Sequence, residues 1–278
     1  MTYAQTDYHQ LPANRNYYER ALIDNMAAKH QAMGIAMDCS NSMDAKEPGS
    51  NFSNIELLSK SMNMIGSDRE LAPYKSRIDV CILQFSDNVR TVVDWTPMSL
   101  LECHFDLKTE NTTSMFEAVI QLIMAVRARI EVYKQNGIES YRPPLFIYTD
   151  GSPTDPENFE EARALCERYV YTHRMDLTFI LLPGASTSAI EKLDGGTHTI
   201  KKRFLKECTH GIPAAAKFIT NSIVSFNSSM PGAKVYTTID PYIGVEKREV
   251  VVDDNGNYAI EDTVSMVDNS DIVWGGRA

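Results

Sequence analysis

The chain has 278 residues, of which 43% are hydrophobic and 23% charged, a composition typical of a soluble globular protein with a substantial core. Its formal net charge of −10 argues against general nucleic-acid binding, which requires a basic surface that displaces counterions. The apolar stretches are too short to span a bilayer, and residues 1–15 are too polar for a secretory signal. We therefore expect a cytoplasmic protein that binds neither nucleic acid nor a membrane.

Residues 1–29 are interpreted as an N-terminal extension with a short helical pattern from Asn16 to Lys29. From residue 30 to about 230, nearly continuous apolar runs alternate with helical patterns, which indicates strands that are covered on both faces. The predicted strands are 33–38, 78–86, 89–94, 144–150, 176–182 and 202–206, and the predicted helices are 52–65, 115–135, 157–173, 186–193 and 212–228.

The connections between these elements predict the topology. Only Ser86-Asp87-Asn88 is short enough for a hairpin, so strand 89–94 is expected to be antiparallel to its neighbour. All other connections require crossovers. The sequence therefore predicts a doubly wound, Rossmann-like α/β fold with a mostly parallel six-stranded sheet and one antiparallel edge strand.

The predicted helix 115–135 has recognisable ends and one apolar face. Ser114 and Glu117 form a possible capping box at its start, and Asn136-Gly137 is a stop signal. An apolar stripe at helical spacing, which predicts a core face, consists of Phe116, Ile120, Ile123 and Val126.

Residues 231–278 have a different character. Segments 235–243 and 245–252 are predicted strands, and the turn signal at 254–257 precedes a third apolar stretch at 258–260. We predict a C-terminal β-ribbon followed by an acidic tail, which is most simply a solvated, flexible segment. A competing interpretation is that one of its carboxylates occupies the metal site described next.

Two predicted strands end in an aspartate that begins a polar loop. Asp38 starts the segment Asp38-Cys39-Ser40-Asn41-Ser42, and Asp150 starts the segment 150–155, DGSPTD. Ligands of open parallel sheets bind outside the carboxyl ends of the strands, so both loops are expected at one crevice. Carboxylates, hydroxyls and waters are the ligands that Mg²⁺ or Mn²⁺ prefers. The sequence therefore predicts a divalent-cation site; a simple polar turn after each strand is the alternative.

A third loop precedes the helix 115–135. Thr112 and Thr113 stand immediately before it, and a hydroxyl there would complete the oxygen ligands of an octahedral cation. Because Ser114 is interpreted as the cap, Thr113 is favoured over Thr112, although the sequence leaves both open.

Asp38-x-Ser40-x-Ser42, Thr113 and Asp150-Gly151 resemble the metal-ion-dependent adhesion site of von Willebrand factor type A (VWA) domains. The loop 150–155 is similar to the DGxPTD loop of the bacterial tellurium-resistance (TerY-type) branch. The resemblance covers residues 30–230, which would form the VWA domain. Glu110-Asn111-Thr112 stands where the family usually has two glycines before its threonine.

The resemblance implies that Ser40, Ser42 and Thr113 bind the cation through their hydroxyls, whereas Asp38 and Asp150 act mainly through water. A partner protein would supply an aspartate or glutamate to the remaining position. The implied protein is a non-enzymatic interaction module of a stress-response, tellurium-resistance or phage-defence system.

Two other functions are compatible with the same residues. The first is a magnesium-dependent phosphatase or phosphotransfer enzyme with an aspartate nucleophile, for which Asp44 and Asp155 would supply further charge. The serine at position 40 counts against it, because such enzymes often carry a carboxylate there. The second is a structural subunit whose metal site is vestigial.

The five cysteines form no CxxC pair, and no P-loop, GxGxxG, HExxH or GxSxG pattern occurs.

Overall fold

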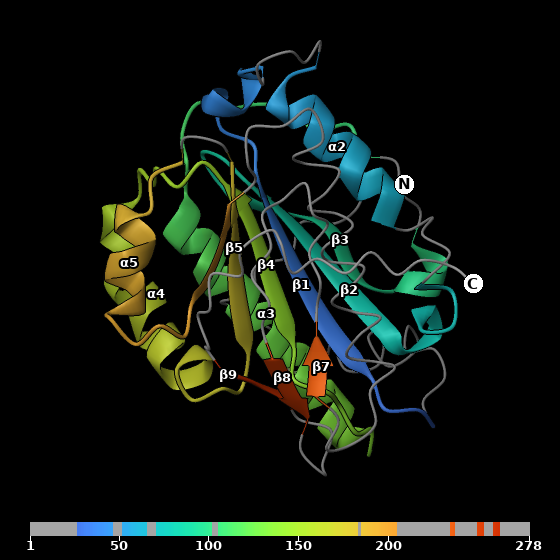
Figure 1. The fold of residues 1–278 in the computed structure, drawn as a ribbon. Helices are drawn as coiled ribbons and strands as arrows, with labels where there is room; N and C mark the ends of the chain where they lie inside the picture. The colour runs from blue at the N-terminus through green and yellow to red at the C-terminus, as the bar shows by residue number, and fades with distance from the viewer. Residues whose placement is uncertain are drawn as a thin grey trace, which may run out of the picture.

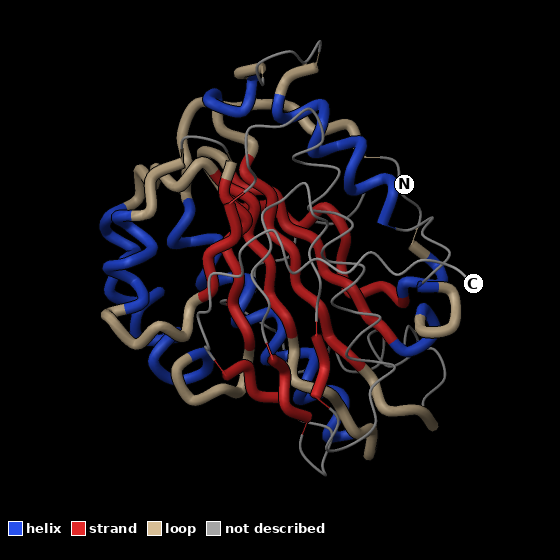
Figure 2. The backbone as a smooth tube through the Cα atoms, in the orientation of Figure 1, coloured by secondary structure: helices blue, strands red, loops and turns tan. Residues whose placement is uncertain are grey.

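The computed structural model describes residues 27–46, 52–65, 71–101, 105–182, 185–204, 234–236, 249–252 and 258–261. Six strands within these ranges form one twisted sheet with helices packed on both of its faces, and three short strands near the C-terminus form a second sheet (Figures 1 and 2). In the described part of the chain, no helix is long and apolar enough to cross a membrane.

The large sheet confirms the predicted topology. It consists of β1 (Gln31–Asp38), β2 (Ile78–Phe85), β3 (Val89–Pro97), β4 (Pro144–Thr149), β5 (Asp176–Leu181) and β6 (Lys201–Phe204). The strand order is β3-β2-β1-β4-β5-β6, and every neighbouring pair is parallel except β2 and β3. The six-stranded α/β fold with an antiparallel edge strand, β3, is therefore confirmed.

The connecting helices also follow the predicted pattern. They are α2 (Asn54–Ile65), α3 (Met115–Gln135), α4 (Phe159–Leu165) and α5 (Ser188–Asp194). The 3-10 turns are η2 (Asn41–Asp44), η4 (Lys75–Arg77), η5 (Met98–Leu100) and η6 (Pro156–Asn158), and Cys166–Val170 forms a π-helical turn. Predicted helix 212–228 and the helical pattern at 16–29 lie outside the described residues, apart from the last few residues of the latter.

Strand β1 divides the core between the two faces of the sheet. Its small residues face α3, whereas Met33, Ile35 and Met37 pack on the side of α2. A side chain at Gly34 would meet Leu122 at 2.8 Å, so the glycine permits α3 to lie directly against the strand. This close packing fixes α3 relative to β1.

Helix α3 has the predicted bounds but a different N-terminal cap. The predicted apolar stripe is buried, and the helix ends at Asn136 as expected. The capping-box prediction is wrong, because the Ser114 side chain makes no cap hydrogen bond. Instead, the two carboxylate oxygens of Asp155 accept the backbone N–H groups of Phe116 and Glu117, at 3.3 and 2.8 Å. A carboxylate bridging two free N–H groups satisfies this helix start better than a single hydroxyl does.

The predicted helix 157–173 is less regular than its sequence pattern suggests. After η6 and α4 it widens into the π-helical turn 166–170, in which the Tyr171 N–H donates to the Cys166 carbonyl. His173 then takes a left-handed conformation with φ of 54° and ends the segment. The apolar periodicity persists through this region, which is why periodicity alone could not show the wider turn.

The second sheet agrees with the predicted C-terminal ribbon in its strand positions. It consists of β7 (Lys234–Tyr236), β8 (Glu249–Val252) and β9 (Tyr258–Glu261), which pair antiparallel in that order. The described strands are shorter than the predicted segments 235–243 and 245–252. The turn signal at 254–257 and the acidic tail lie outside the described residues, and the boundaries at residues 30 and 230 stay predictions.

Candidate metal centre

The strand order places the two aspartate loops side by side. The chain leaves β1 toward β2 and β3 and returns to the other side of β1 as β4, so the order reverses between β1 and β4. Asp38 is the last residue of β1, and Asp150 follows directly after β4. A crevice at such a reversal is the usual ligand site of an open parallel sheet.

Asp38 is a fully buried carboxylate with two hydrogen bonds. Its Oδ1 accepts the Ser40 N–H at 2.9 Å, and its Oδ2 accepts the Thr149 hydroxyl at 2.7 Å. Burial raises its pKa to about 6 despite these hydrogen bonds, and the nearby Asp150 charge raises it further. A buried carboxylate whose charge is disfavoured in this way is a group that a bound cation would stabilise.

The first loop brings two hydroxyls together. Ser40 follows β1 by one residue, and the 3-10 turn η2 begins directly after it, with the Met43 N–H donating to the Ser40 carbonyl. This turn places the Oγ atoms of Ser40 and Ser42 2.9 Å apart. Ser40 is buried and Ser42 is exposed, so the pair reaches from the interior of the crevice to its surface.

The second loop lies against the first. The Glu110 N–H donates to the Cys39 carbonyl at 2.8 Å, and Glu110 forms a β-bridge with Ser40. At the rim, the Glu110 carboxylate accepts a hydrogen bond of 2.6 Å from Ser86 and forms an ion pair of 2.9 Å with Arg90. The carboxylate of Glu110 is thereby held by groups of β3 and the β2–β3 hairpin.

The structure distinguishes between the two threonines of this loop. Thr112 is exposed, and both its N–H and its hydroxyl donate to the Asp87 carboxylate, at 2.8 and 2.7 Å. Thr113 is only 5% exposed, and its hydroxyl makes no hydrogen bond within the described part of the chain. The Thr113 hydroxyl is therefore the better candidate ligand, although its role stays a prediction.

The third loop is tied to the second by a reciprocal pair of hydrogen bonds. The Thr113 N–H donates to the Thr154 hydroxyl, and the Thr154 N–H donates to the Thr113 carbonyl, both at 2.9 Å. At the start of this loop, Gly151 has φ of 80°, and a Cβ there would lie 1.9 Å from the Ser186 carbonyl oxygen. Only glycine fits this turn.

The five predicted residues therefore lie on three loops that hydrogen bonds join at one end of the sheet. Three hydroxyls and two carboxylates are a hard-oxygen set that suits Mg²⁺ or Mn²⁺. The described ranges contain no group of three or more His, Cys, Asp or Glu residues placed so that they could hold a metal ion, so this candidate centre depends on hydroxyl oxygens. The residues present fit a divalent cation; the identity of the ligands stays a prediction.

Sequence reasoning missed the residues that support this centre. Thr149 holds Asp38, Thr154 holds the Thr113 loop, and Asp87 holds Thr112. Thr154 and the helix-capping Asp155 belong to the DGSPTD segment, so that motif was a signal for both. Thr149 gave no signal, because a threonine within an apolar run reads as an ordinary strand residue.

The described domain has the VWA fold, as comparison with solved structures shows. The pilus adhesin SpaC from Lactobacillus rhamnosus GG is 10% identical over 73% of this chain and 31% of its own, with a TM-score of 0.54. The open conformation of SpaC is 9% identical over 84% of this chain and 37% of its own, with the same TM-score. Proximal thread matrix protein 1 from the mussel byssus, solved with a zinc-occupied MIDAS motif, gives 14% identity, 73% and 46% coverage, and a TM-score of 0.44.

This chain spans less than half the length of these two proteins. No protein-family model and no curated protein sequence matches the chain. The similarity to SpaC, at 10% identity, establishes the fold alone, and function has to be argued from the site itself.

Proposed function

We propose that this chain is a non-enzymatic interaction module in which a divalent cation, Mg²⁺ or Mn²⁺, binds an aspartate or glutamate of a partner protein. The observation that carries the proposal is the pair of hydroxyls of Ser40 and Ser42, 2.9 Å apart beside the buried carboxylate of Asp38. Both hydroxyls are neutral ligands, which can hold a cation without neutralising it.

The distribution of charge around the centre supports this role. Asp38 and Asp150 are proposed to reach the cation mainly through water, so the metal would keep positive charge for an incoming carboxylate. Glu110 is a further acid of the second loop, and Ser86 and Arg90 already bind its carboxylate. A partner's acidic side chain would therefore meet an incompletely neutralised cation at the surface.

The arrangement is less favourable for the enzymatic alternative. That alternative requires additional carboxylates at the metal, and Asp44 and Asp155 were its candidates. The Asp44 carboxylate accepts the Thr109 hydroxyl at 2.8 Å, and the Asp155 carboxylate caps α3. Steady hydrolysis of p-nitrophenyl phosphate that Asp38→Asn abolishes would revive the phosphatase alternative.

A peptide-display selection tests the proposed interaction, because it requires no named partner. Peptides selected on the immobilised protein in Mg²⁺ should be enriched in aspartate or glutamate and should dissociate in EDTA. Asp38→Ala and Asp150→Ala should lose this binding, whereas Glu160→Ala, which removes an exposed acid of α4, should retain it. Selected peptides without acidic enrichment, or binding that persists in EDTA, would contradict the proposal.

The cellular role is proposed from the sequence resemblance alone. We infer a cytoplasmic protein of a bacterial stress-response system of the tellurium-resistance or phage-defence type. Deleting the gene should increase sensitivity to tellurite or to phage, and the wild-type gene should restore resistance whereas Asp38→Ala should not.

A further inference from the structure

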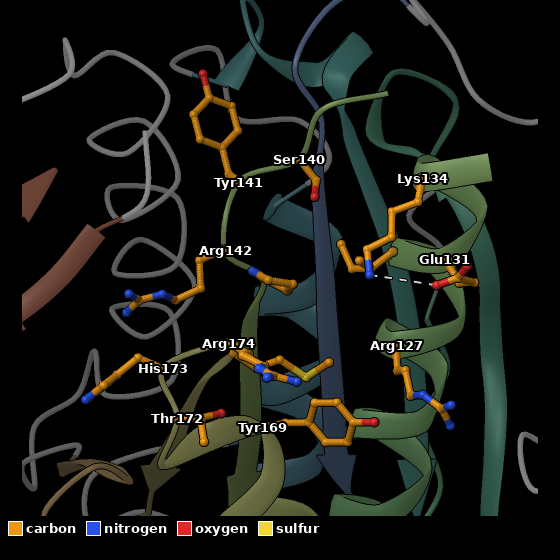
Figure 3. Close-up of a pocket in the computed structure, with 13 residues that line it drawn as sticks. Arg127, Glu131, Lys134, Ser140, Tyr141, Arg142, Tyr169, Thr172, His173 and Arg174 are labelled. Atoms are coloured by element: carbon orange, nitrogen blue, oxygen red, sulfur yellow. Dashed lines mark ion pairs between the residues drawn. The ribbon is translucent and has the colours of Figure 1, made fainter. Parts of the chain in front are cut away.

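A cavity of about 610 Å³ lies at the end of the sheet opposite the candidate metal centre (Figure 3). Its walls are the last turns of α3, the segment 140–143 that leads into β4, and the segment 169–175 that leads into β5. These are the amino ends of the strands. None of the five predicted metal ligands lines this cavity, so it is a separate feature of the molecule.

Cationic side chains outnumber acidic ones in the lining, although the whole chain has a net charge of −10. Arg127 and Lys134 come from α3, whereas Arg142 and Arg174 come from the two segments that precede the strands (Figure 3). Glu131 is the single acidic residue of the lining. Four cations against one acid leave an excess of three positive charges, and a concave surface concentrates their field.

Neighbouring acids compensate these charges only in part. Glu131 lies 3.8 Å from Lys134, and both side chains are more than half exposed, so this pair is weak. Asp176 lies 3.6 Å from Arg142 but also binds Lys201 at 3.0 Å, so two cations share its charge. For Arg127 and Arg174, both exposed, the described part of the chain contains no ion pair.

Helix dipoles do not remove the excess. The C-terminal ends of α3 and of the helical segment 159–170 both lie at the cavity, and each contributes roughly half a negative charge. About two positive charges therefore remain. A purely structural explanation, in which cations complement helix ends, accounts for Lys134. Arg142 is nearly buried and pairs with Asp176, but neither explanation accounts for Arg174, which is exposed and lies outside the helices.

The backbone beside Arg174 is held in an uncommon conformation. The carbonyl of Tyr169, in the π-helical turn, accepts the N–H groups of both Arg174 and Met175 at 2.9 Å. His173, which lies between this turn and Arg174, has φ of 54°, a left-handed conformation that non-glycine residues rarely adopt. Such turns and left-handed residues are enriched at ligand sites, and this one fixes the segment that carries Arg174 into the cavity wall.

We propose that this cavity binds a small phosphorylated molecule of nucleotide size. Guanidinium groups pair with phosphate oxygens through two parallel hydrogen bonds, and Arg127 and Arg174 offer such groups from opposite walls. The volume lies within the range of small-molecule sites. The ring of Tyr169, which also lines the cavity, provides a flat surface for a base or sugar. The ring of Tyr141 points away from it and lies under the Lys29 amino group, 4.6 Å from the ring centroid (Figure 3).

Calorimetric titration with ADP and with pyrophosphate tests the proposal. EDTA should be present in both titrations, so that a nucleotide–metal complex cannot bind at the candidate metal centre. Both probes should bind in low salt, and raising the salt should weaken binding. The double variant Arg127→Gln/Arg174→Gln should weaken binding at least tenfold, because both proposed phosphate-binding guanidinium groups are lost. Both side chains are exposed, so their replacement should leave the core intact. Arg163→Gln, at a partly exposed arginine of α4 outside the cavity, should leave binding unchanged.

The outcomes separate the sources of binding. Equal affinity for both probes supports recognition of the phosphates alone, and tighter binding of ADP supports a contact with the base as well. Citrate that binds as tightly as pyrophosphate would overturn the assignment to phosphate. Absence of binding by both probes at millimolar concentration, or an equal loss in Arg163→Gln, would overturn the site. Unchanged thermal denaturation of each variant checks that the fold is intact.

Discussion

The Thr149 hydroxyl donates a hydrogen bond of 2.7 Å to the Asp38 carboxylate, and it thereby joins the ends of β4 and β1. The same Thr149 oxygen accepts the Gly151 N–H at 3.0 Å. One side chain thus orients both a predicted metal-binding carboxylate and the loop that carries the other. Residues that orient ligands in this way commonly affect metal affinity by 10- to 100-fold, as an order of magnitude.

Replacing Thr149 with valine should therefore weaken Mg²⁺ or Mn²⁺ binding by about tenfold or more. The shape of the side chain is retained, so loss of the hydroxyl is the main change. Titration calorimetry with Mn²⁺ measures the effect. Thr178→Val, at a buried threonine of the neighbouring strand β5, is the matched control and should leave affinity unchanged. Equal affinities for wild type and Thr149→Val would contradict the prediction.

The two threonines before α3 should respond differently to the loss of their hydroxyls. Thr113→Val should abolish cation binding, because its hydroxyl is the proposed ligand. Thr112→Val should retain binding and lose only the hydrogen bonds to Asp87. The shift of the melting temperature on addition of Mg²⁺ distinguishes them, since a ligand stabilises the state that binds it. A shift that disappears in Thr112→Val and persists in Thr113→Val would reverse the assignment.

Gly151→Ala should disrupt the third loop of the candidate metal centre. The added Cβ would lie 1.9 Å from the Ser186 carbonyl oxygen, so either Asp150 or the Ser186 segment has to move. Gly196→Ala provides a sharp control, because Gly196 has a similar φ of 78° and nothing lies within 4 Å of its added Cβ. Both variants bear the backbone strain, and only Gly151→Ala should also lose metal binding, as measured by calorimetry.

The N-terminal cap of α3 gives a prediction about stability. Asp155→Ala should destabilise the protein by about 1–2 kcal/mol, because two helix N–H groups lose their acceptor. Ser114→Ala should cost much less, since the Ser114 hydroxyl donates to the Asp87 carbonyl and caps nothing. Urea denaturation compares the two variants. A larger loss in Ser114→Ala would restore the capping box predicted from the sequence.

A buried ion cluster between β2 and α3 predicts that the stability of the protein depends on pH. Asp79 lies 3.2 Å from both His30 and Arg129 and accepts a hydrogen bond from Tyr133, and the charged groups are fully buried. Burial opposes the charge of Asp79, but these partners outweigh it and hold its pKa below the ordinary value. The resulting stability is present above about pH 4, the ordinary value, and is lost as the pH falls through the lowered pKa.

Asp79→Asn should therefore cost about 3–5 kcal/mol at neutral pH, because Arg129 is left buried without its counter-charge. The difference in the free energy of unfolding between the variant and the wild type, measured by urea denaturation, should decrease as the pH is lowered below about 4. Tyr133→Phe removes one hydrogen bond and keeps the ion pair, so it should cost only about 1–2 kcal/mol. A difference between wild type and Asp79→Asn that stays constant with pH would contradict the prediction.

The sequence was most informative where burial decides the residue types. Parallel strands covered on both faces read as apolar runs, so all six strands of the large sheet were found within a few residues. The α3 cap was missed because its acceptor, Asp155, lies 38 residues beyond Glu117, whereas a capping box is a local pattern. The five candidate ligands were named from motifs, and their coordination of a metal stays a prediction. The cavity at the other end of the sheet could not be foreseen, because its cations come from three separate segments.

The close contact between Gly34 and Leu122 means that substitutions far from the candidate ligands can also affect the metal centre. An added Cβ at position 34 would lie 2.8 Å from Leu122 and 3.1 Å from Val126, so either these two side chains move or they push α3 away from β1. Thr113 immediately precedes α3, whereas Asp38 ends β1, so such a push would separate two candidate ligands without touching either. A random-mutagenesis screen for loss of cation binding should therefore return substitutions at this apolar, interior position as well as substitutions in the loops themselves.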